Sequence, residues 1–153
     1  MKALIIYDSQ FGNTEKIAKA IARGIGENVE VKNVNDASIN DIKGVELLIV
    51  GSPTHGGQAT PAIQNFLKSL PDNLLKGVKV SAFDTRSSDE GKAWLKIIIN
   101  IFKFPAPRMA KVLQAKDGNL AAEPEGFIVK GKEGPLIEGE LERAEKWGKK
   151  LLI

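Results

Sequence analysis

The stretch Ser9-Gln10-Phe11-Gly12-Asn13-Thr14 decides how this chain folds, because it joins a predicted strand to a predicted helix. Before it, the apolar run Ala3-Leu4-Ile5-Ile6-Tyr7 is typical of a strand that is buried on both faces. After it, residues 15–22 place apolar side chains on one helical face, namely Ile17, Ala18, Ile21 and Ala22. The stretch is therefore predicted to be a tight turn that begins the helix.

The composition of this turn favours a phosphate site. The start of a helix carries free backbone N–H groups and the positive end of the helix dipole, which together attract an anion. Ser9 and Thr14 add hydroxyl donors. Asn13 adds an amide, and Gly12 lets the backbone approach a ligand closely. The alternative is a plain helix-capping turn that uses Asn13 or Thr14.

The same turn excludes two common nucleotide-binding motifs. It contains neither Lys nor Arg, and it matches neither GxxxxGK[ST] nor GxGxxG. A phosphate that is held without a formal positive charge indicates a terminal monoester on a cofactor. A polyphosphate that needs Mg²⁺ is not expected.

Length and composition narrow the class of protein. The 153 residues suit one domain, residues 1–153, with one sizeable core. Cysteine is absent and histidine occurs once, so no disulfide, thiolate nucleophile or typical metal site is expected. The net charge of +3 comes from scattered residues of both signs, which does not indicate nucleic-acid binding. We recognise no signal peptide and no membrane-spanning run, and we expect a cytoplasmic protein.

Strands and helices alternate along the whole chain. Strands are predicted at 3–7, 29–34, 46–52 and 79–83, with an interrupted last strand at 120–122 and 126–130. Helices are predicted from 15 to about 24, at 61–70 and at 140–151, with a short one at 38–42. This alternation predicts an α/β fold, a three-layer doubly wound sheet of five parallel strands. We assign it the strand order 2-1-3-4-5, which is a common order of such sheets.

The apolar stretch 94–102 is interpreted as a further covering helix. Its β-branched residues leave a strand as the alternative, and an exposed partner-binding face is the other open interpretation. Pro105 and Pro107 are expected to break this helix, and residues 108–113 to add a helical turn or two.

Three polar loops follow the first, third and fourth predicted strands. In the order 2-1-3-4-5 these loops meet beyond the carboxyl ends of the strands, where sheets of this kind bind ligands. The loops are the opening turn, Pro53-Thr54-His55-Gly56-Gly57, and the stretch that begins with Asp84-Thr85-Arg86.

Taken together, these features resemble the flavodoxin family. The opening turn is close to [ST]-x-[ST]-G-[NT]-T, the loop with which that family binds the phosphate of FMN; it departs at Phe11, where the family often has a hydroxyl. The resemblance implies that the loop 53–57 lies against the isoalloxazine ring. Gly56 and Gly57 tolerate positive φ, so a peptide there could rotate when flavin N5 gains a proton. Asp84-Thr85-Arg86 would supply donors toward the pyrimidine edge.

The resemblance also implies a function. It indicates an FMN-binding electron carrier that works through the semiquinone and hydroquinone states of the flavin with redox partner proteins, as a monomer or weak dimer. The alternative is an FMN-dependent NAD(P)H:quinone reductase, and a non-redox regulatory domain is a third interpretation. A phospho-acceptor receiver is set aside, because the third strand ends in Gly51-Ser52 instead of Asp.

Two side chains of the predicted site have alternative roles. His55, where the family often has Trp, contacts the flavin in one interpretation and is a solvent-exposed loop residue in the other. Arg86 faces the pyrimidine edge or forms a surface ion pair with Asp84, Asp89 or Glu90. The basic net charge and the lack of a Tyr in the third loop also depart from electron-carrying members of the family.

Overall fold

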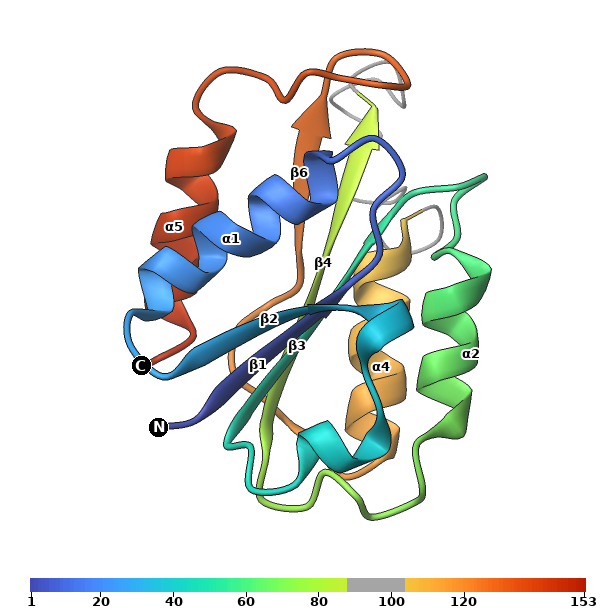
Figure 1. Cartoon of the computed structure of the whole chain (residues 1–153), viewed down its shortest axis with the longest axis vertical. Helices are drawn as coiled ribbons and strands as arrows, with labels where there is room; N and C mark the ends of the chain where they lie inside the picture. The colour runs from blue at the N-terminus through green and yellow to red at the C-terminus, as the bar shows by residue number, and fades with distance from the viewer. Residues whose placement is uncertain (88–103) are drawn as a thin grey trace.

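A parallel β-sheet lies at the centre of the computed structural model, which describes residues 1–87 and 104–153 (Figure 1). Its strands are β1 (Ala3–Tyr7), β2 (Val29–Asn33), β3 (Leu47–Pro53), β4 (Lys79–Ser87), β5 (Asn119–Leu120) and β6 (Glu125–Val129). The order is β2-β1-β3-β4-β5, and β6 also pairs with β4. The predicted order is thus confirmed, with β2 at an edge as its alternating sequence indicates.

The last predicted strand is interrupted as expected. β5 pairs with Lys79 and Val80 at the start of β4, and β6 pairs in parallel with Phe83–Ser87 at its end. The two short strands therefore share one edge of β4. Pairing with β6, and with β3 at residues 84 and 85, extends β4 through residues 84–87, where the sequence predicts a loop.

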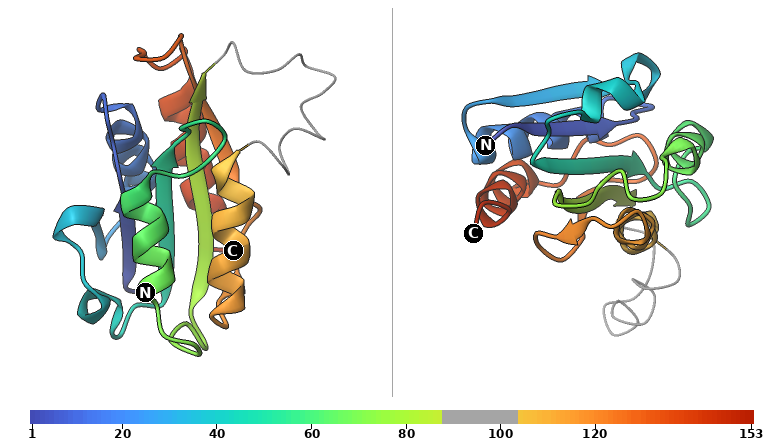
Figure 2. Two further views of the ribbon diagram at one scale, coloured as in Figure 1. Left: turned by 90° about the vertical axis from the view of Figure 1, so that its right-hand side faces the viewer. Right: turned by 90° about the horizontal axis from the view of Figure 1, so that it is seen from below.

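Helices cover both faces of the sheet (Figures 1 and 2). Their bounds are α1 (Asn13–Ile25), α2 (Pro61–Ser69), α4 (Pro105–Ala115) and α5 (Glu140–Lys150). α1 and α5 lie on one face, and α2 and α4 lie on the other with two short 3-10 turns, Val34–Asp36 and Ile39–Ile42. The predicted helix at 94–102 lies outside the described residues.

Alternation along the central strands supplies a separate core to each helical layer. Leu4 and Ile6 of β1 point toward α2, whereas Ala3, Ile5 and Tyr7 point toward α1. The strands are continuously apolar because both faces are buried. Under α1 and α5, the rings of Phe83, Phe127 and Trp147 meet edge to face, with ring centres 6.2–6.4 Å apart.

Prolines begin two of the helices. Pro61 follows Thr60, which caps the helix because its Oγ1 accepts the N–H of Ile63. Pro105 is the first residue of α4, which therefore begins earlier and is longer than the helical turn or two expected at 108–113. The helix that Pro105 and Pro107 are expected to break lies outside the described residues. A proline in the first turn has no intrahelical hydrogen bond to lose, because N–H groups there have no partner within the helix.

Two glycines allow α1 and α5 to pack closely. A Cβ atom at Gly24 of α1 would overlap the carbonyl oxygen of Glu145, and one at Gly148 of α5 would overlap the carbonyl oxygen of Ile21. Each helix therefore places backbone directly against backbone of the other.

We expect Gly148→Ala to lower the free energy of unfolding by about 1–3 kcal/mol, because the added methyl group overpacks this contact. In an open helical site the same change would raise stability by about 1 kcal/mol. The sign of the effect therefore shows whether α1 and α5 are in close contact at this position. Urea unfolding measures it, with the exposed Lys146→Ala as a control that should stay within about 0.5 kcal/mol. A stabilised Gly148→Ala variant would show that the two helices can separate at no cost.

Candidate functional site

A cavity of about 590 Å³ opens at the carboxyl ends of β1, β3 and β4. This volume falls within the roughly 300–1,000 Å³ of small-molecule sites, and the position is the one where doubly wound sheets bind ligands. The lining comes from four segments of the chain: Gln10, Phe11, Asn13 and Thr14; Pro53, Thr54, His55 and Gly56; Thr85 and Ser87; Val129, Gly131 and Lys132.

The first loop leaves the start of α1 open. Gly12 precedes the helix with a left-handed φ of 90°, and no side chain caps the helix there. The Ser9 Oγ instead accepts the Gly12 N–H at 3.0 Å, and the Asp8 carboxylate accepts the Ser9 N–H at 2.9 Å. The capping interpretation with Asn13 or Thr14 is therefore wrong, because Ser9 and Asp8 hold the turn and leave the helix start available to a ligand.

A pair of hydroxyl groups forms one wall of the cavity. Oγ1 of Thr14, on α1, lies 2.8 Å from Oγ1 of Thr85, on β4, and both side chains are buried. Each hydroxyl has one proton, and only one of the two protons is needed for this hydrogen bond. The pair therefore keeps a second O–H that could donate to an anion at the helix start.

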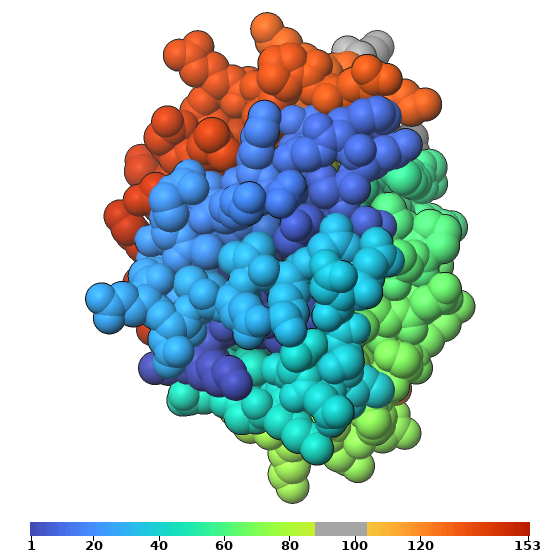
Figure 3. All heavy atoms as spheres, in the orientation of Figure 1, coloured from blue at the N-terminus to red at the C-terminus, as the bar shows by residue number. Residues whose placement is uncertain are grey.

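The loop after β6 closes the cavity on its far side. Nδ2 of Asn13 donates to the carbonyl oxygen of Glu133 at 2.9 Å, so this loop is tied to α1 (Figure 3, where the blue and orange segments adjoin). Gly131 and Lys132 of this loop line the cavity. Sequence analysis missed this segment, because only its glycines mark it as a turn and it matches no motif.

The second loop makes a tight turn beside the cavity. Gly56 and Gly57 have φ values of 57° and 80°, and the backbones of His55 and Gln58 bond to each other in both directions. Both central residues thus adopt a conformation that glycine favours. His55 is exposed and lines the cavity, which agrees with both interpretations of this residue.

Thr54 adds an unusual polar atom to the same wall. Its Oγ1 is buried, yet it has no hydrogen-bond partner among the residues that the structure describes. A buried hydroxyl without a partner costs about 1–3 kcal/mol. Because Thr54 lines the cavity, a polar atom of a bound ligand could satisfy it.

Asp84 and Arg86 do not line the cavity, in contrast to their predicted place beside a flavin. They lie two residues apart on β4 and so share the face opposite to Thr85. The guanidinium donates to the Asp84 carboxylate at 2.7 and 2.8 Å, and both side chains are buried. The interpretation as an ion pair is nearer to the structure, although the pair is buried and not on the surface.

The buried pair also organises the start of α4. The Asp84 carboxylate accepts the N–H of Ala106 at 3.0 Å, and the Arg86 guanidinium lies 3.7 Å from the ring centre of Phe104. Burial raises the pKa of Asp84, although Arg86 and the Ala106 N–H oppose this shift. The carboxylate therefore acts as a helix cap supplied by a neighbouring strand.

Within residues 1–87 and 104–153, no three side chains of the His, Cys, Asp and Glu types gather as they would around a metal ion. Nor does any helix in those ranges have the length and apolar character that crossing a membrane requires.

Comparisons with known proteins identify the family. The model of the family described as Flavodoxin matches residues 5–147, so the chain belongs to the flavodoxin family. The chain is 37% identical to a flavodoxin of Maridesulfovibrio salexigens over 95 residues, which are 58% of this chain and 65% of that protein. A flavodoxin of Aquifex aeolicus is 35% identical over 77 residues, 48% of this chain and 42% of that protein. The matches thus span less than two thirds of both relatives.

Solved structures show the same fold. A flavodoxin from the domain Archaea superposes with a TM-score of 0.74 at 19% identity, covering 99% of this chain and 96% of that one. Oxidised flavodoxin 1 from Bacillus cereus superposes with a TM-score of 0.73 at 21% identity, and the match covers 99% of this chain and 97% of that one. Proteins of this family bind FMN, the cofactor that the sequence predicts.

We expect Asp84→Ala to destabilise the protein by about 3–5 kcal/mol, because it leaves the buried Arg86 guanidinium without its carboxylate. The double variant Asp84→Leu/Arg86→Met removes both charges and should recover most of this loss. Urea unfolding compares the two variants with the wild type. If the double variant proved as unstable as the single one, the cost would come from the α4 cap and not from an unpaired charge.

Proposed function

We propose that this chain is an electron carrier that holds FMN in the cavity at the carboxyl ends of β1, β3 and β4. One observation carries the proposal: the start of α1 has no side-chain cap and opens into a cavity. The loops after β1 and β3 line this cavity, and they are the loops with which the flavodoxin family is expected to hold FMN. An uncapped helix start is a ready anion site, and FMN carries one terminal phosphate.

The residues of the cavity fit such a cofactor. The second O–H of the Thr14–Thr85 pair and the N–H groups of the first turn of α1 would hold the phosphate. The Thr54 hydroxyl would donate to a polar atom of the cofactor, since it lacks a partner among the described residues. Phe11, 44% exposed, and the His55 ring could cover apolar surface of the flavin.

FMN, when bound, supplies one- and two-electron chemistry. The chain would hold the ring and adjust its hydrogen bonds. Gly56 and Gly57 let the peptides of their turn reorient with no side chain in the way, so a carbonyl or an N–H could face a ring nitrogen. Lys132, at the rim, would partly balance the negative charge of the phosphate or of the reduced ring.

The phosphate site is tested with Thr14→Val/Thr85→Val, which removes both hydroxyls and nearly conserves volume. Fluorescence quenching of FMN and riboflavin by the apoprotein measures both affinities. We expect FMN binding to weaken by about 1.5–3 kcal/mol, roughly 10- to 150-fold, because a donor to a charged group is lost. Riboflavin affinity should not change, and FAD should bind far more weakly than FMN to the wild type.

Ser81→Ala is the matched control. Its hydroxyl lies on the same strand but donates to the carbonyl oxygen of Ala122, away from the cavity, so FMN affinity should be unaffected. An equal loss of FMN and riboflavin affinity in the double Thr variant would place the phosphate elsewhere. A purified protein with no flavin spectrum and no affinity for added FMN would refute the proposed function as a whole.

The role of Lys132 is tested by Lys132→Ala, with Lys130→Ala as control. Both side chains are exposed and belong to the same loop, but only Lys132 lines the cavity. We expect a few-fold loss of FMN affinity at low salt, corresponding to about 0.5–1 kcal/mol for an exposed charge. The loss should disappear in about 0.5 M salt because such a charge is screened. Identical effects of the two variants would show that Lys132 acts on FMN only through the overall positive charge of the surface, as Lys130 does.

A quinone reductase is the second candidate function. An NAD(P)H dehydrogenase (quinone) of Rhodopseudomonas palustris is 28% identical over 133 residues, 67% of each chain. Steady-state oxidation of NADPH by the FMN-loaded protein with a quinone distinguishes the two candidates, since an electron carrier has no nicotinamide site.

Location in the cytoplasm and a monomeric or weakly dimeric state belong to the main proposal. The lack of cysteine is compatible with a reducing compartment.

A further inference from the structure

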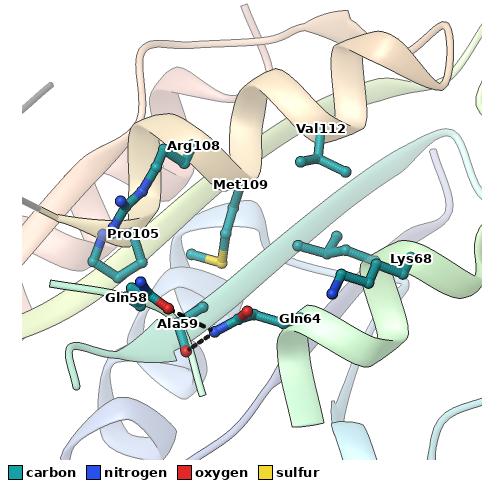
Figure 4. A pocket seen from close by; sticks show the side chains of 9 residues that line it. Gln58, Ala59, Gln64, Lys68, Pro105, Arg108, Met109 and Val112 are labelled. Carbon is teal, nitrogen blue, oxygen red and sulfur yellow. Dashed lines mark hydrogen bonds between the residues drawn. The ribbon is translucent and has the colours of Figure 1, made fainter. Parts of the chain in front are cut away.

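A second cavity lies between α2 and α4, on the face of the sheet opposite to α1 and α5. Its volume is about 240 Å³, and Figure 4 shows the Met109 side chain pointing into it from α4. The floor is apolar and buried except for the half-buried Val112, whereas the rim is polar and exposed except for the half-buried Gln64. The floor comprises Ala59, Leu67, Pro105, Met109 and Val112, and the rim comprises Gln58, Gln64, Lys68 and Arg108.

The size of this cavity favours a side chain over a cofactor. It falls below the roughly 300–1,000 Å³ of typical small-molecule sites. A well-packed apolar pocket with a polar rim is what a central anchor residue of a protein partner fills, most often an aromatic one. The cavity is therefore suited to one large apolar side chain.

The charged residues among the described lining of the cavity, Lys68 and Arg108, are both basic. Neither α2 nor α4 contains Asp or Glu, whereas they carry Lys68, Arg108 and Lys111. Lys68 and Arg108 form no ion pair with other described residues, and the nearby Asp72 is already paired with Lys116 at 3.0 Å. An acidic partner would meet complementary charge over both helices.

The cavity also adjoins the cofactor loop. Gln58 is part of its rim and closes the His55–Gln58 turn, while Nε2 of Gln64 donates to Oε1 of Gln58 at 3.4 Å and to the carbonyl oxygen of Ala59 at 2.7 Å. Figure 4 shows these two bonds joining α2 to the end of the loop. A partner bound here would lie beside the loop that lines the larger cavity.

We propose that the α2–α4 cavity is the docking site for an acidic electron-transfer protein. The partner seats one large apolar side chain on Met109 and places carboxylates against Lys68 and Arg108. The identity of the partner as a redox protein rests on the proposed function. The docking itself depends only on the shape and charge of this face and does not require bound flavin.

The test measures binding of a dye-labelled acidic [2Fe–2S] ferredoxin to the full chain by fluorescence anisotropy, with and without FMN. At low ionic strength we expect saturable binding that weakens steadily with salt. Lys68→Glu/Arg108→Glu should weaken it at least tenfold. The control Lys146→Glu/Lys150→Glu makes the same change of net charge on exposed positions of α5 and should weaken it less than twofold.

A second pair of variants tests the apolar seat. Val112→Phe fills the cavity without changing charge and should weaken binding about fivefold with the same salt dependence. Gln114→Phe adds the same ring to an exposed position of α4 outside the cavity and should have no effect. Circular dichroism confirms the fold of each variant, and the surface charge variants keep the test decisive if Val112→Phe fails to fold.

Three results would overturn the proposal. They are the absence of saturable ferredoxin binding, equal losses in the two charge-reversed pairs, and a self-associated chain that Lys68→Glu/Arg108→Glu dissociates. The last result would assign the face to a second copy of the chain. Failure of FMN to bind would refute the proposed function alone, since the apoprotein measurements still decide the docking.

Discussion

The buried ion pair of Asp84 and Arg86 is the interaction on which the arrangement of the site depends. It lies on the face of β4 toward α4, where it satisfies two charges and supplies the cap of α4 through Ala106. Because side chains alternate along a strand, holding these two residues on one face directs Thr85 to the other. There Thr85 meets Thr14 at the start of α1. One strand thus anchors a helix on one side and forms a cavity wall on the other.

The same division of the sheet into two faces separates the two cavities. The larger one collects polar groups at the carboxyl ends of the strands, where backbone N–H groups and hydroxyls could neutralise an anion with a single cation, Lys132, among its described lining residues. The smaller one lies between helices whose ionisable residues are all basic. The loop from Pro53 to Gln58 connects them, so a cofactor and a partner could both contact one short segment.

The structure shows where the residues that depart from the family pattern lie. Phe11 replaces a hydroxyl that other members often have, yet its ring lines the cavity and remains partly exposed. The Thr14–Thr85 pair provides a hydroxyl from β4 in the same region. The basic net charge of the chain, unusual beside the acidic electron carriers that the sequence resembles, includes the cations of the α2–α4 face.

The amino-acid sequence by itself determined the alternation of strands and helices and the polar edge of the sheet, because these follow from local periodicity and from the turn around Gly12. The predicted sheet order is confirmed, but it rests on how folds of this class are wound and not on local periodicity. The tertiary structure alone decided which polar residues reach the cavity. Residues 84–87 are polar and so resemble a loop, but pairing with β3 and β6 makes them a strand and turns Arg86 away from the site. Lys132 lines the site on a loop that Asn13 holds against α1 through the carbonyl oxygen of Glu133, 120 residues away in sequence. Local pattern cannot reveal such contacts, since they depend on which distant segments pack side by side.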